Sequence, residues 1–451
     1  MKVTKILHSY QLNPGKYTTL KQQALLLGEI RTEVWERFGA VSGLKLKDRE
    51  VRDAWMAEGR EFLVPANAWK ETLRDTFGDI KAAREAAKEK VKKAIRERTA
   101  DKKELKRLYG LLKYDNWMDD PFLHRQMRKH FRHGRNHTYN QIVVRADNHK
   151  SFELDGRCWL KIPSLKRGKL IAIPLNTTME FAPTGTLRLI LKHGQVEVHF
   201  QKEVEIEQSC GTAKVGVDKG YTEALVDSDG EVYGEGLGNL ISKESDYLNQ
   251  KYKRRNKIKA VAKKKAKKKP LKTAAIEQNN LGRQKLDKRQ DRQAQQLRTL
   301  IFTGVHQLVN KAATIVCEDL SSPFASKRRY GKNSARRLNT WTKGIIADAL
   351  ETVSQRRGSS LRLVNAAYTS QADSQCHGLL MGRRDGDKFY RENGDVMQAD
   401  HNAAGNVLLR DEDPEITLFT PYTQVKALLV KRTESYRSKL IDQDSSYTPP
   451  L

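Results

Sequence analysis

Short apolar strands and helices follow one another in a distinctive order over the second half of this chain, and this order limits the fold more than any other feature. Three strands come first, and the last two are joined by Asp229-Gly230, a pair that favours a hairpin turn. The expected elements are, in order, strands in AKVGVDKG (213–220), YTEALVDS (221–228) and EVYGEG (231–236), a charged helical region at roughly 243–311, a strand in TIVCEDL (314–320), a helix at about 341–357, a strand in LRLVNA (361–366) and a helix in ADHNAAGNVLLR (399–410). We therefore expect an α/β domain in this part of the chain.

The first half of the chain has two different sequence patterns, one typical of helices and one typical of strands. Residues 1–18 form an extended opening segment, and the chain from about 18 to 139 is mostly helical, with a break near Thr99–Asp101 between two long helices. Residues 141–207 alternate apolar and polar positions, with β-branched residues and frequent Gly, Pro and Asn. This pattern predicts a small antiparallel β unit, with a barrel as one form it could take. The opening strand could pair with this unit, which would make the helical block an insertion.

The charge of the chain points to a polyanionic partner. There are 84 Lys and Arg residues against 55 Asp and Glu residues, a formal net charge of +29. Such an excess favours nucleic acid, because each neutralised phosphate releases counterions. Membrane lipid is the competing polyanion, but no run of 18 apolar residues occurs, and the first residues lack the apolar core of a signal peptide.

The four cysteines are too dispersed for a disulfide framework. They are Cys158, Cys210, Cys317 and Cys376, and no CxxC pair exists. The spacing also argues against a complete four-thiolate zinc site. A reducing cytoplasm is therefore the expected compartment.

Three acidic residues stand where strands end or a helix begins. Asp218 ends the apolar strand KVGVD, Glu318 ends TIVCE, and Asp400 precedes His401-Asn402 at the expected helix start. Each of them alone could be an ordinary strand-end acid, and Asp400 could be a plain helix cap. Taken together with the order of the elements, the trio matches an RNase H-like α/β core.

The chemistry of phosphodiester cleavage explains why such a trio would be useful. Two divalent ions about 3.5–4 Å apart can activate a water and stabilise the leaving oxygen. Magnesium prefers carboxylate oxygens while keeping several waters. Without metal the carboxylates would repel one another and raise their pKa values. Asp218, Glu318 and Asp400 are therefore candidate ligands for Mg²⁺, which Mn²⁺ could replace.

Four segments resemble the TnpB family, RNA-guided nucleases encoded by insertion sequences and closely related to compact type V CRISPR effectors. GVDKGYTEALVDSDG (216–230), IVCEDLSS (315–322) and ADHNAAGNVLLR (399–410) are similar to the three RuvC motifs of the family, and AYTSQADSQC (367–376) is similar to the segment before its zinc ribbon. The resemblance is specific over roughly 210–410 and weak over 1–209, where only the order of textures agrees.

The resemblance implies an RNA-guided DNA endonuclease with Asp218, Glu318 and Asp400 as catalytic carboxylates and with a guide RNA and a target DNA as partners. It implies a multidomain chain, and the length of the chain leaves both a monomer and a dimer open. The implied parts are a β-barrel wedge domain (1–18 and 141–208), a helical recognition lobe (19–140), a RuvC-like nuclease domain (209–369 and 396–410), a degenerate zinc-ribbon-like insert (370–395) and a C-terminal tail without assigned role (411–451).

One departure from the family concerns zinc. The positions that correspond to its two CxxC pairs are Asp373 and Cys376, then Tyr390 and Asn393, so only one thiol remains. The block 382–400 instead resembles the zinc-less version of a cyanobacterial branch that includes transposon-associated type V-K effectors. We therefore predict no zinc, with the insert held by packing of Tyr368, Phe389 and Tyr390.

Basic residues outside the motifs are candidates for phosphate contacts, which position a nucleic acid without reading its sequence. The alternative is a solvated helix face. The candidates are Lys251, Lys253, Arg254, Arg255, Arg328, Arg329, Arg336 and Arg337. The histidines at 124, 130, 133 and 137 are interleaved with Arg and Lys, which would repel a metal cation. The aromatics Trp69, Trp117, Phe131 and Trp341 could stack on bases, although such residues are more often core.

Three functions stay open. A guided endonuclease, of the TnpB kind or a compact type V CRISPR effector, would cut DNA. A guided DNA-binding protein with little cleavage would repress or recruit transposition machinery. An unguided transposase or junction resolvase could use the same core, because a fold alone does not fix the activity.

Overall fold

The structure is a computed structural model that describes residues 2–166, 168–203, 208–266, 268–320 and 342–445. The chain divides into two compact units, Met1–Glu205 and Ile206–Leu451. None of the helices among the described residues is apolar over a length that could cross a membrane. The finer division into five domains predicted from the sequence stays a prediction.

Two antiparallel sheets form the β part of the first unit. The strands are β1 (Lys2–His8), β2 (Gln141–Val144), β3 (Lys150–Leu154), β4 (Arg157–Pro163), β5 (Leu170–Pro174), β6 (Leu187–Lys192) and β7 (Gln195–Glu203). One sheet has the order β1-β7-β6-β2, the other β3-β4-β5, and a bridge between Ser9 and Leu175 joins them. The opening strand therefore pairs with the β unit, as predicted, and the helices are inserted after it. Closure into a barrel stays a prediction.

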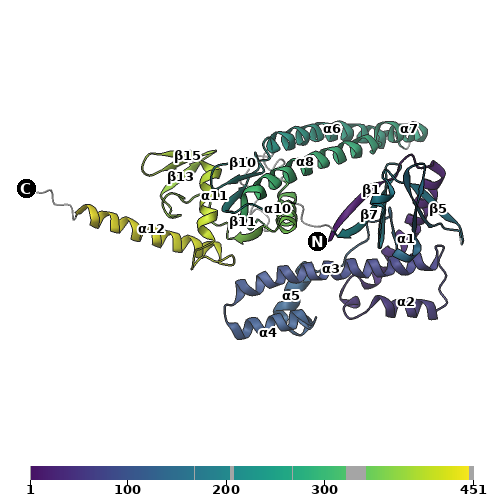
Figure 1. The fold of residues 1–451 in the computed structure, drawn as a ribbon, viewed down its shortest axis with the longest axis horizontal. Helices are drawn as coiled ribbons and strands as arrows, with labels where there is room; N and C mark the ends of the chain where they lie inside the picture. Colours follow the sequence, from purple (N-terminus) through teal and green to yellow (C-terminus); the bar gives the residue numbers. More distant parts are fainter. Residues whose placement is uncertain (1, 167, 204–207, 267, 321–341, 446–451) are drawn as a thin grey trace, which may run out of the picture. The chain divides into compact units, whose positions relative to one another are not determined.

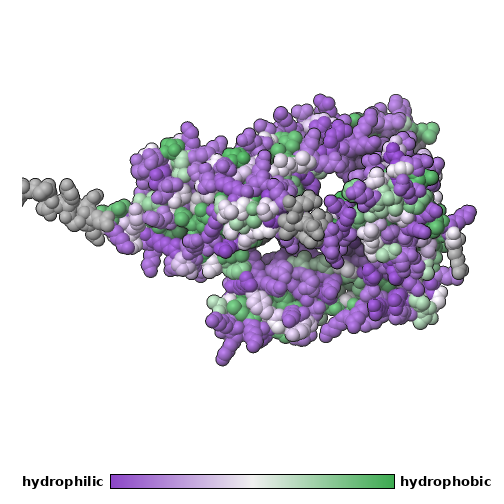
Figure 2. All heavy atoms as spheres, viewed as in Figure 1, coloured by the Kyte–Doolittle hydropathy of each residue, from purple (hydrophilic) through white to green (hydrophobic). Residues whose placement is uncertain are grey.

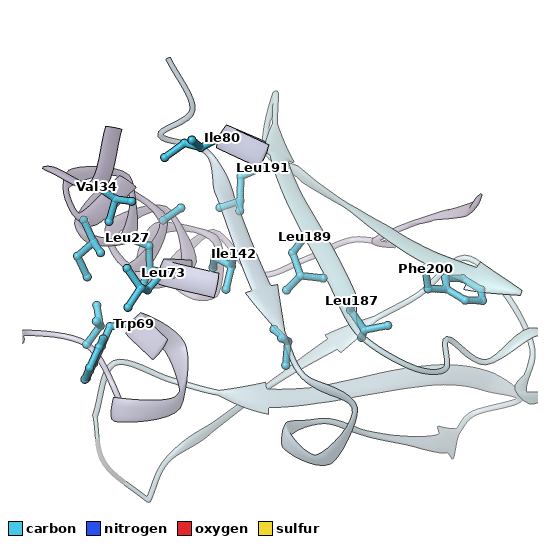
Figure 3. Packing of buried hydrophobic residues seen from close by; sticks show 14 of the residues in the cluster. Leu27, Val34, Trp69, Leu73, Ile80, Ile142, Leu187, Leu189, Leu191 and Phe200 are labelled. Carbon is cyan, nitrogen blue, oxygen red and sulfur yellow. The ribbon is translucent and has the colours of Figure 1, made fainter. Parts of the chain in front are cut away.

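The helices of the first unit cover this β part with a shared core. They are α1 (Pro14–Phe38), α2 (Asp48–Ala57), α3 (Ala66–Arg98), α4 (Lys102–Lys113) and α5 (Pro121–His130). The predicted break near Thr99 is confirmed, because the Asp101 carboxylate accepts the backbone N–H groups of Lys103 and Glu104 and so caps α4. Figure 3 shows Leu73 of α3 beside Ile142 of β2, with Leu189 of β6 nearby.

Three of the aromatic residues considered for base stacking lie in this core. Trp69, Trp117 and Phe131 are all buried, and Trp69 stacks on Phe62 with ring centroids 4.5 Å apart. Their rings are therefore not available to a nucleic acid strand. Trp341 lies outside the described residues.

A mixed five-stranded sheet organises the second unit. Its strands are β8 (Ala213–Lys219), β9 (Leu225–Asp227), β10 (Val232–Tyr233), β11 (Ala312–Glu318) and β12 (Ser360–Val364). The order is β10-β9-β8-β11-β12, with β11 parallel to both β8 and β12. The predicted order of the strands along the chain is confirmed, although β9 spans only part of the predicted segment. This arrangement places the carboxyl ends of β8 and β11 side by side.

Helices cover both faces of this sheet (Figure 1). The helices of this unit are α6 (Leu237–Lys265), α7 (Pro270–Asn280), α8 (Gln284–Lys311), α10 (Lys343–Arg357), α11 (Ala399–Arg410) and α12 (Tyr422–Ser445). Of these, α8 and α10 lie on one face of the sheet and α11 lies on the other. Val215 and Val217 pack in one cluster with residues of α8 and α10. Val316 packs on the opposite side with Val407 of α11. The alternation of strand side chains thus separates the two helical layers.

A small sheet lies in the chain between β12 and α11. It has the order β13-β14-β15, with strands Gly382–Asp385, Lys388–Arg391 and Val396–Gln398. The C-terminal tail, for which no role was predicted, supplies α12. Val425 and Leu429 of α12 pack on Tyr368 and Ile416, and the Thr433 hydroxyl accepts the backbone N–H of Leu380.

Candidate active site

The register of the central strands brings two of the predicted acids to the same edge of the sheet. Val217 of β8 is the partner of Cys317 of β11. Asp218 and Glu318 are the next residues along these parallel strands. Since parallel strands end at the same edge, their carboxylates become neighbours.

A glycine lets the third acid join them. Asp400 lies in the first turn of α11, and α11 packs against β8 at Gly216. A Cβ built on Gly216 would collide with the carbonyl oxygen of Ala404 and would lie 2.6 Å from the Leu408 nitrogen. The start of the helix is fixed by His401, whose Nε2 is 3.1 Å from the carbonyl oxygen of Ser228. The bare backbone of β8 therefore allows α11 to approach.

The charges of Glu318 and Asp400 both act on Asp218. Burial raises the pKa of Asp218 well above its ordinary value, and the charges of Glu318 and Asp400 raise it further. Burial also raises the pKa of Glu318, against the lowering effect of a hydrogen bond from Thr369. Two of the acids therefore hold their protons more tightly than free carboxylates do.

Two neighbours of Glu318 were not recognised from the sequence. The Thr369 hydroxyl donates to Glu318 Oε1, and Lys219 Nζ donates to the Glu318 backbone carbonyl at 2.7 Å. Thr369 is itself held by α11, because Asn406 Nδ2 donates to its carbonyl at 2.9 Å. These bonds fix both the backbone and the carboxylate of Glu318. In the sequence, the only related feature was the Thr-Ser pair in the segment after β12 that resembles the family.

Arg384 is a third feature that the sequence did not reveal. It lies on β13, and its Nη2 donates to Asp400 Oδ1 at 2.8 Å. Its positive charge also lowers the pKa of both Asp218 and Glu318, and so opposes the larger effect of burial. One guanidinium thus compensates part of the charge of all three acids.

The donor set fits a hard divalent cation in its chemistry, since it consists of carboxylate oxygens from three elements. Bound there, such ions would supply the activation of a water and the stabilisation of a leaving oxygen. Within the part of the chain that the structure describes, no group of three or more His, Cys, Asp or Glu side chains is already placed to hold one ion together. Asp400 is instead engaged by Arg384.

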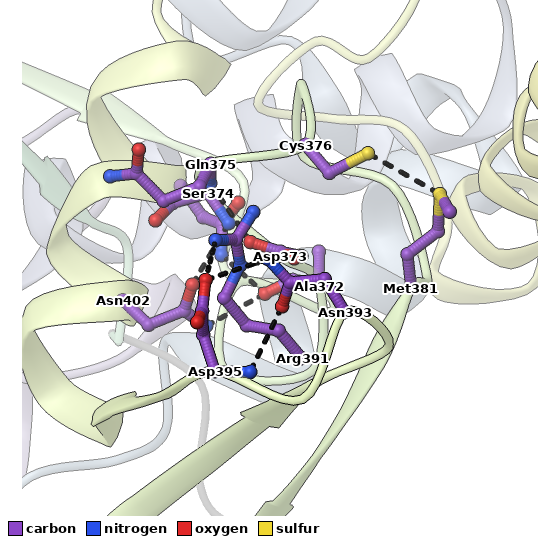
Figure 4. Close-up of polar contacts among 11 residues, drawn as sticks. Ala372, Asp373, Ser374, Gln375, Cys376, Met381, Arg391, Asn393, Asp395 and Asn402 are labelled. Carbon is purple, nitrogen blue, oxygen red and sulfur yellow. Dashed lines mark hydrogen bonds and ion pairs between the residues drawn. The ribbon is translucent and has the colours of Figure 1, made fainter.

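Polar contacts hold the insert where the family carries cysteines (Figure 4). Asp373 Oδ2 accepts from Arg391 Nε at 2.9 Å, and Asn393 Nδ2 donates to Asp395 at 2.6 Å. The remaining thiol, Cys376 Sγ, lies 3.3 Å from Met381 Sδ. The ion pair between Asp373 and Arg391 therefore connects the two segments that cysteine pairs would join through a metal.

The predicted packing of the insert needs a correction. Phe389 is fully buried, as expected, and Tyr390 is half-buried with Arg383 5.4 Å above its ring. Tyr368, however, stacks on Tyr422 of α12 with ring centroids 4.7 Å apart. Tyr368 therefore joins α12 to the segment after β12. The sequence pattern did not reveal this contact, because it did not indicate α12 as a packing partner.

A known protein family matches part of the second unit. Residues 344–407 match the family described as Cas12f1-like, TNB domain. The match confirms, over the residues it spans, the relation to compact type V nucleases that the motifs indicated. No curated protein matches the chain.

Solved structures of type V effectors are similar to the chain at low identity. A Cas12f1–sgRNA–target DNA complex shares 14% identity and a TM-score of 0.42, with 92% of this chain and 100% of that chain covered. CasPhi-2 (Cas12j) bound to crRNA shares 9% identity and a TM-score of 0.46, with 92% and 99% covered.

The predicted phosphate contacts divide into three groups. Lys251, Lys253 and Arg254 are exposed on α6, and Figure 2 shows mostly hydrophilic side chains on the visible face of the helices α6 and α8. Arg255 is buried, and its guanidinium donates to the carbonyls of Leu281 and Gly282 at 2.6 and 3.0 Å. It closes the end of α7 and is not free for a phosphate, which corrects its assignment. Arg328, Arg329, Arg336 and Arg337 lie outside the described residues.

The histidines of the first unit make separate contacts. His124 stacks on Trp117 with ring centroids 6.1 Å apart, and His133 Nε2 lies 3.2 Å from the Glu36 carbonyl. Burial, followed by the charges of Lys129 and other basic neighbours, lowers the pKa of His130. The positive surroundings expected from the sequence are thus present around this ring.

Proposed function

We propose that this chain is an RNA-guided DNA endonuclease that hydrolyses phosphodiester bonds at Asp218, Glu318 and Asp400. One observation carries the proposal: three carboxylates from β8, β11 and α11 converge at one edge of the sheet, and burial and mutual repulsion raise the pKa of Asp218. An acid cluster that costs stability in this way is typical of a functional site.

The side chains around the cluster have separable tasks in this proposal. Asp218, Glu318 and Asp400 provide the oxygens for Mg²⁺, with two ions as the expected number. Thr369 orients the carboxylate of Glu318 through its hydroxyl. Lys219 fixes the end of β11 through the Glu318 carbonyl. A metal-dependent reaction requires ligands whose side chains are held rigidly in this way.

The partners follow from charge and from relatives. The formal net charge of +29 favours nucleic acid, and the exposed Lys251, Lys253 and Arg254 give α6 a basic surface. The relatives carry an sgRNA and target DNA or a crRNA in their solved complexes. We assign a guide RNA and a target DNA to this chain on these grounds. In the same proposal the seven strands of the first unit are a wedge domain and its helices a recognition lobe, and the chain works in a prokaryotic cytoplasm.

Cleavage of a target plasmid by the purified ribonucleoprotein with Mg²⁺ tests the nuclease. Asp218→Ala is expected to abolish cutting and to leave RNA binding nearly unchanged. Glu351→Gln serves as the control, because this carboxylate is exposed on α10, a helix that supplies none of the three acids. Undiminished cutting by the Asp218 variant would remove the assignment.

A guided binder with little cleavage is the second candidate, and the ion pair between Arg384 and Asp400 favours it. If the pair persists on the target, the protein forms a stable R-loop without strand scission in the same plasmid assay. Sequencing of co-purified RNA separates both guided readings from an unguided nuclease, which would carry no defined RNA species.

A further inference from the structure

The contacts of Asp400 differ from those of the other two acids. Its Oδ1 accepts from Arg384 Nη2 at 2.8 Å, and its Oδ2 lies 3.4 Å from Gln398 Nε2. The Arg384 side chain is 31% exposed and that of Asp400 16%. The ion pair therefore lies at the rim of the site, where water can replace either partner.

The guanidinium occupies the electrostatic position that a metal ion would need. Arg384 favours the charged forms of both Asp218 and Glu318 in addition to pairing with Asp400. The other nearby cation, Lys219, donates instead to the backbone carbonyl of Glu318. A divalent ion on the same oxygens would meet the positive charge of Arg384 at short range.

An arginine cannot relieve this conflict by losing its proton, because its guanidinium stays charged in proteins. It can relieve the conflict only by moving away. We propose that Arg384 is an exchangeable counter-ion: it neutralises Asp400 in the metal-free protein and leaves that oxygen when a divalent ion binds. This inference rests on the proposed function, since it assigns a regulatory contact to the same site.

The hairpin that carries Arg384 is suited to such a movement. Arg384 Nε also donates to the carbonyl of Gly386 at 3.0 Å, so its side chain is tied to the turn between β13 and β14. β13 is an edge strand paired only with β14 among the described strands, and Arg383, Arg384 and Asp385 are exposed. Release of Asp400 would therefore loosen the turn without unfolding the core of the unit.

Metal binding without nucleic acid tests the proposal directly. The full chain is titrated with Mn²⁺, and free Mn²⁺ is followed by electron paramagnetic resonance. Arg384→Ala is expected to tighten binding several-fold, because the competing charge is gone. Arg384→Gln, which keeps most of the side-chain volume, is expected to do the same. Circular dichroism confirms that each variant is folded.

Arg383→Ala is the matched control. It removes the same charge from the neighbouring position of β13, but Arg383 lies over the ring of Tyr390. Its Mn²⁺ affinity is expected to stay near that of the unchanged chain. Equal tightening by the Arg383 and Arg384 variants would overturn the proposal in favour of a general charge effect. No tightening by either Arg384 variant would also overturn it.

Hydrogen exchange gives a second readout. Saturating Mn²⁺ is expected to speed amide exchange at 383–387 in the unchanged chain and to have no further effect in Arg384→Ala. Asp218→Asn separates this inference from the proposed function. If Mn²⁺ binds and the loss of Asp218 weakens it, the metal site stands whatever Arg384 does. If Asp218 has no influence on binding, the metal site itself fails, and the role of Arg384 falls with it.

Discussion

Two carboxylates on neighbouring strands of the second unit have pKa values that are shifted in opposite directions. Asp218 of β8 and Asp227 of β9 lie one register position apart, since Val217 pairs with Asp227. The pKa of Asp218 is raised by burial and by two other acids. Burial would also raise the pKa of Asp227, but hydrogen bonds from Lys311, Tyr233 and the backbone lower it below its ordinary value.

The difference separates an acid that stabilises the fold from one that the fold tolerates. Asp227 is fully buried and joins the β9–β10 hairpin to the end of α8, with Lys311 Nζ at 2.8 Å and the Tyr233 hydroxyl at 2.9 Å. Asp218 has acids as its main charged neighbours. Proteins keep such unfavourable clusters where function requires them, at a cost in stability.

The largest effect is expected from Asp227→Ala. The loss of this carboxylate removes a fully buried acceptor from Lys311 and Tyr233, which keep the exposed Asp229 and Glu231 as partners. The expected cost is about 3 kcal/mol, the upper end of the range for hydrogen bonds to charged groups. Urea unfolding at neutral pH measures the change. A loss below about 1 kcal/mol would contradict the structural role of Asp227.

Asp373 extends the comparison to the insert. Its side chain is 3% exposed and paired with Arg391, so Asp373→Ala is expected to cost about 2 kcal/mol, the range of hydrogen bonds to charged groups. Cys376→Ser is the control, with an expected change under about 0.5 kcal/mol. A thermal midpoint that falls on addition of a zinc chelator would show that a metal, and not this ion pair, holds the insert.

The smallest effect has the opposite sign. Asp218→Asn removes a repelled charge from the metal-free protein, so we expect a gain of about 1 kcal/mol in the free energy of unfolding at neutral pH. The same variant is expected to be inactive in the cleavage assay. A clear loss of stability would mean that Asp218, like Asp227, is a structural acid.

The pH dependence gives this last prediction its sign. Because the pKa of Asp218 is raised in the folded protein, its stabilising effect is complete below the ordinary aspartate pKa and is lost as pH rises through the raised value. Asp227 behaves in the reverse way: its effect is complete above the ordinary pKa and is lost as pH falls through its lowered value. In Asp218→Asn, the free energy of unfolding is therefore expected to change less with pH on the neutral side of the range between acid and neutral pH.

Much of the fold could be predicted from the sequence because it depends on local pattern. The alternation in 195–203 and the apolar runs before Asp218 and Glu318 gave the strands. Parallel pairing then brings the strand ends together whatever the loops do. The convergence of the three acids followed from this topology and from the start of α11 at Ala399.

The contacts that refine the site could not be predicted in the same way. Arg384 lies 16 residues before Asp400, and Thr369 lies 51 residues after Glu318. Nothing in their local sequence marks them as partners. Arg255 was wrongly assigned for the opposite reason: it lies in a basic run, but its helical position turns it toward the end of α7. Side-chain direction in a charged segment depends on tertiary packing, which residue type does not encode.

The close approach at Gly216 makes the position of Asp400 depend on a residue that takes no part in the proposed reaction. A single methyl group there would meet the backbone of α11 and push the helix outward, and Asp400 would move with it. The three acids would all remain in the chain, yet they would no longer share one edge. A cleavage-deficient binder could thus be engineered at a residue that carries no side chain.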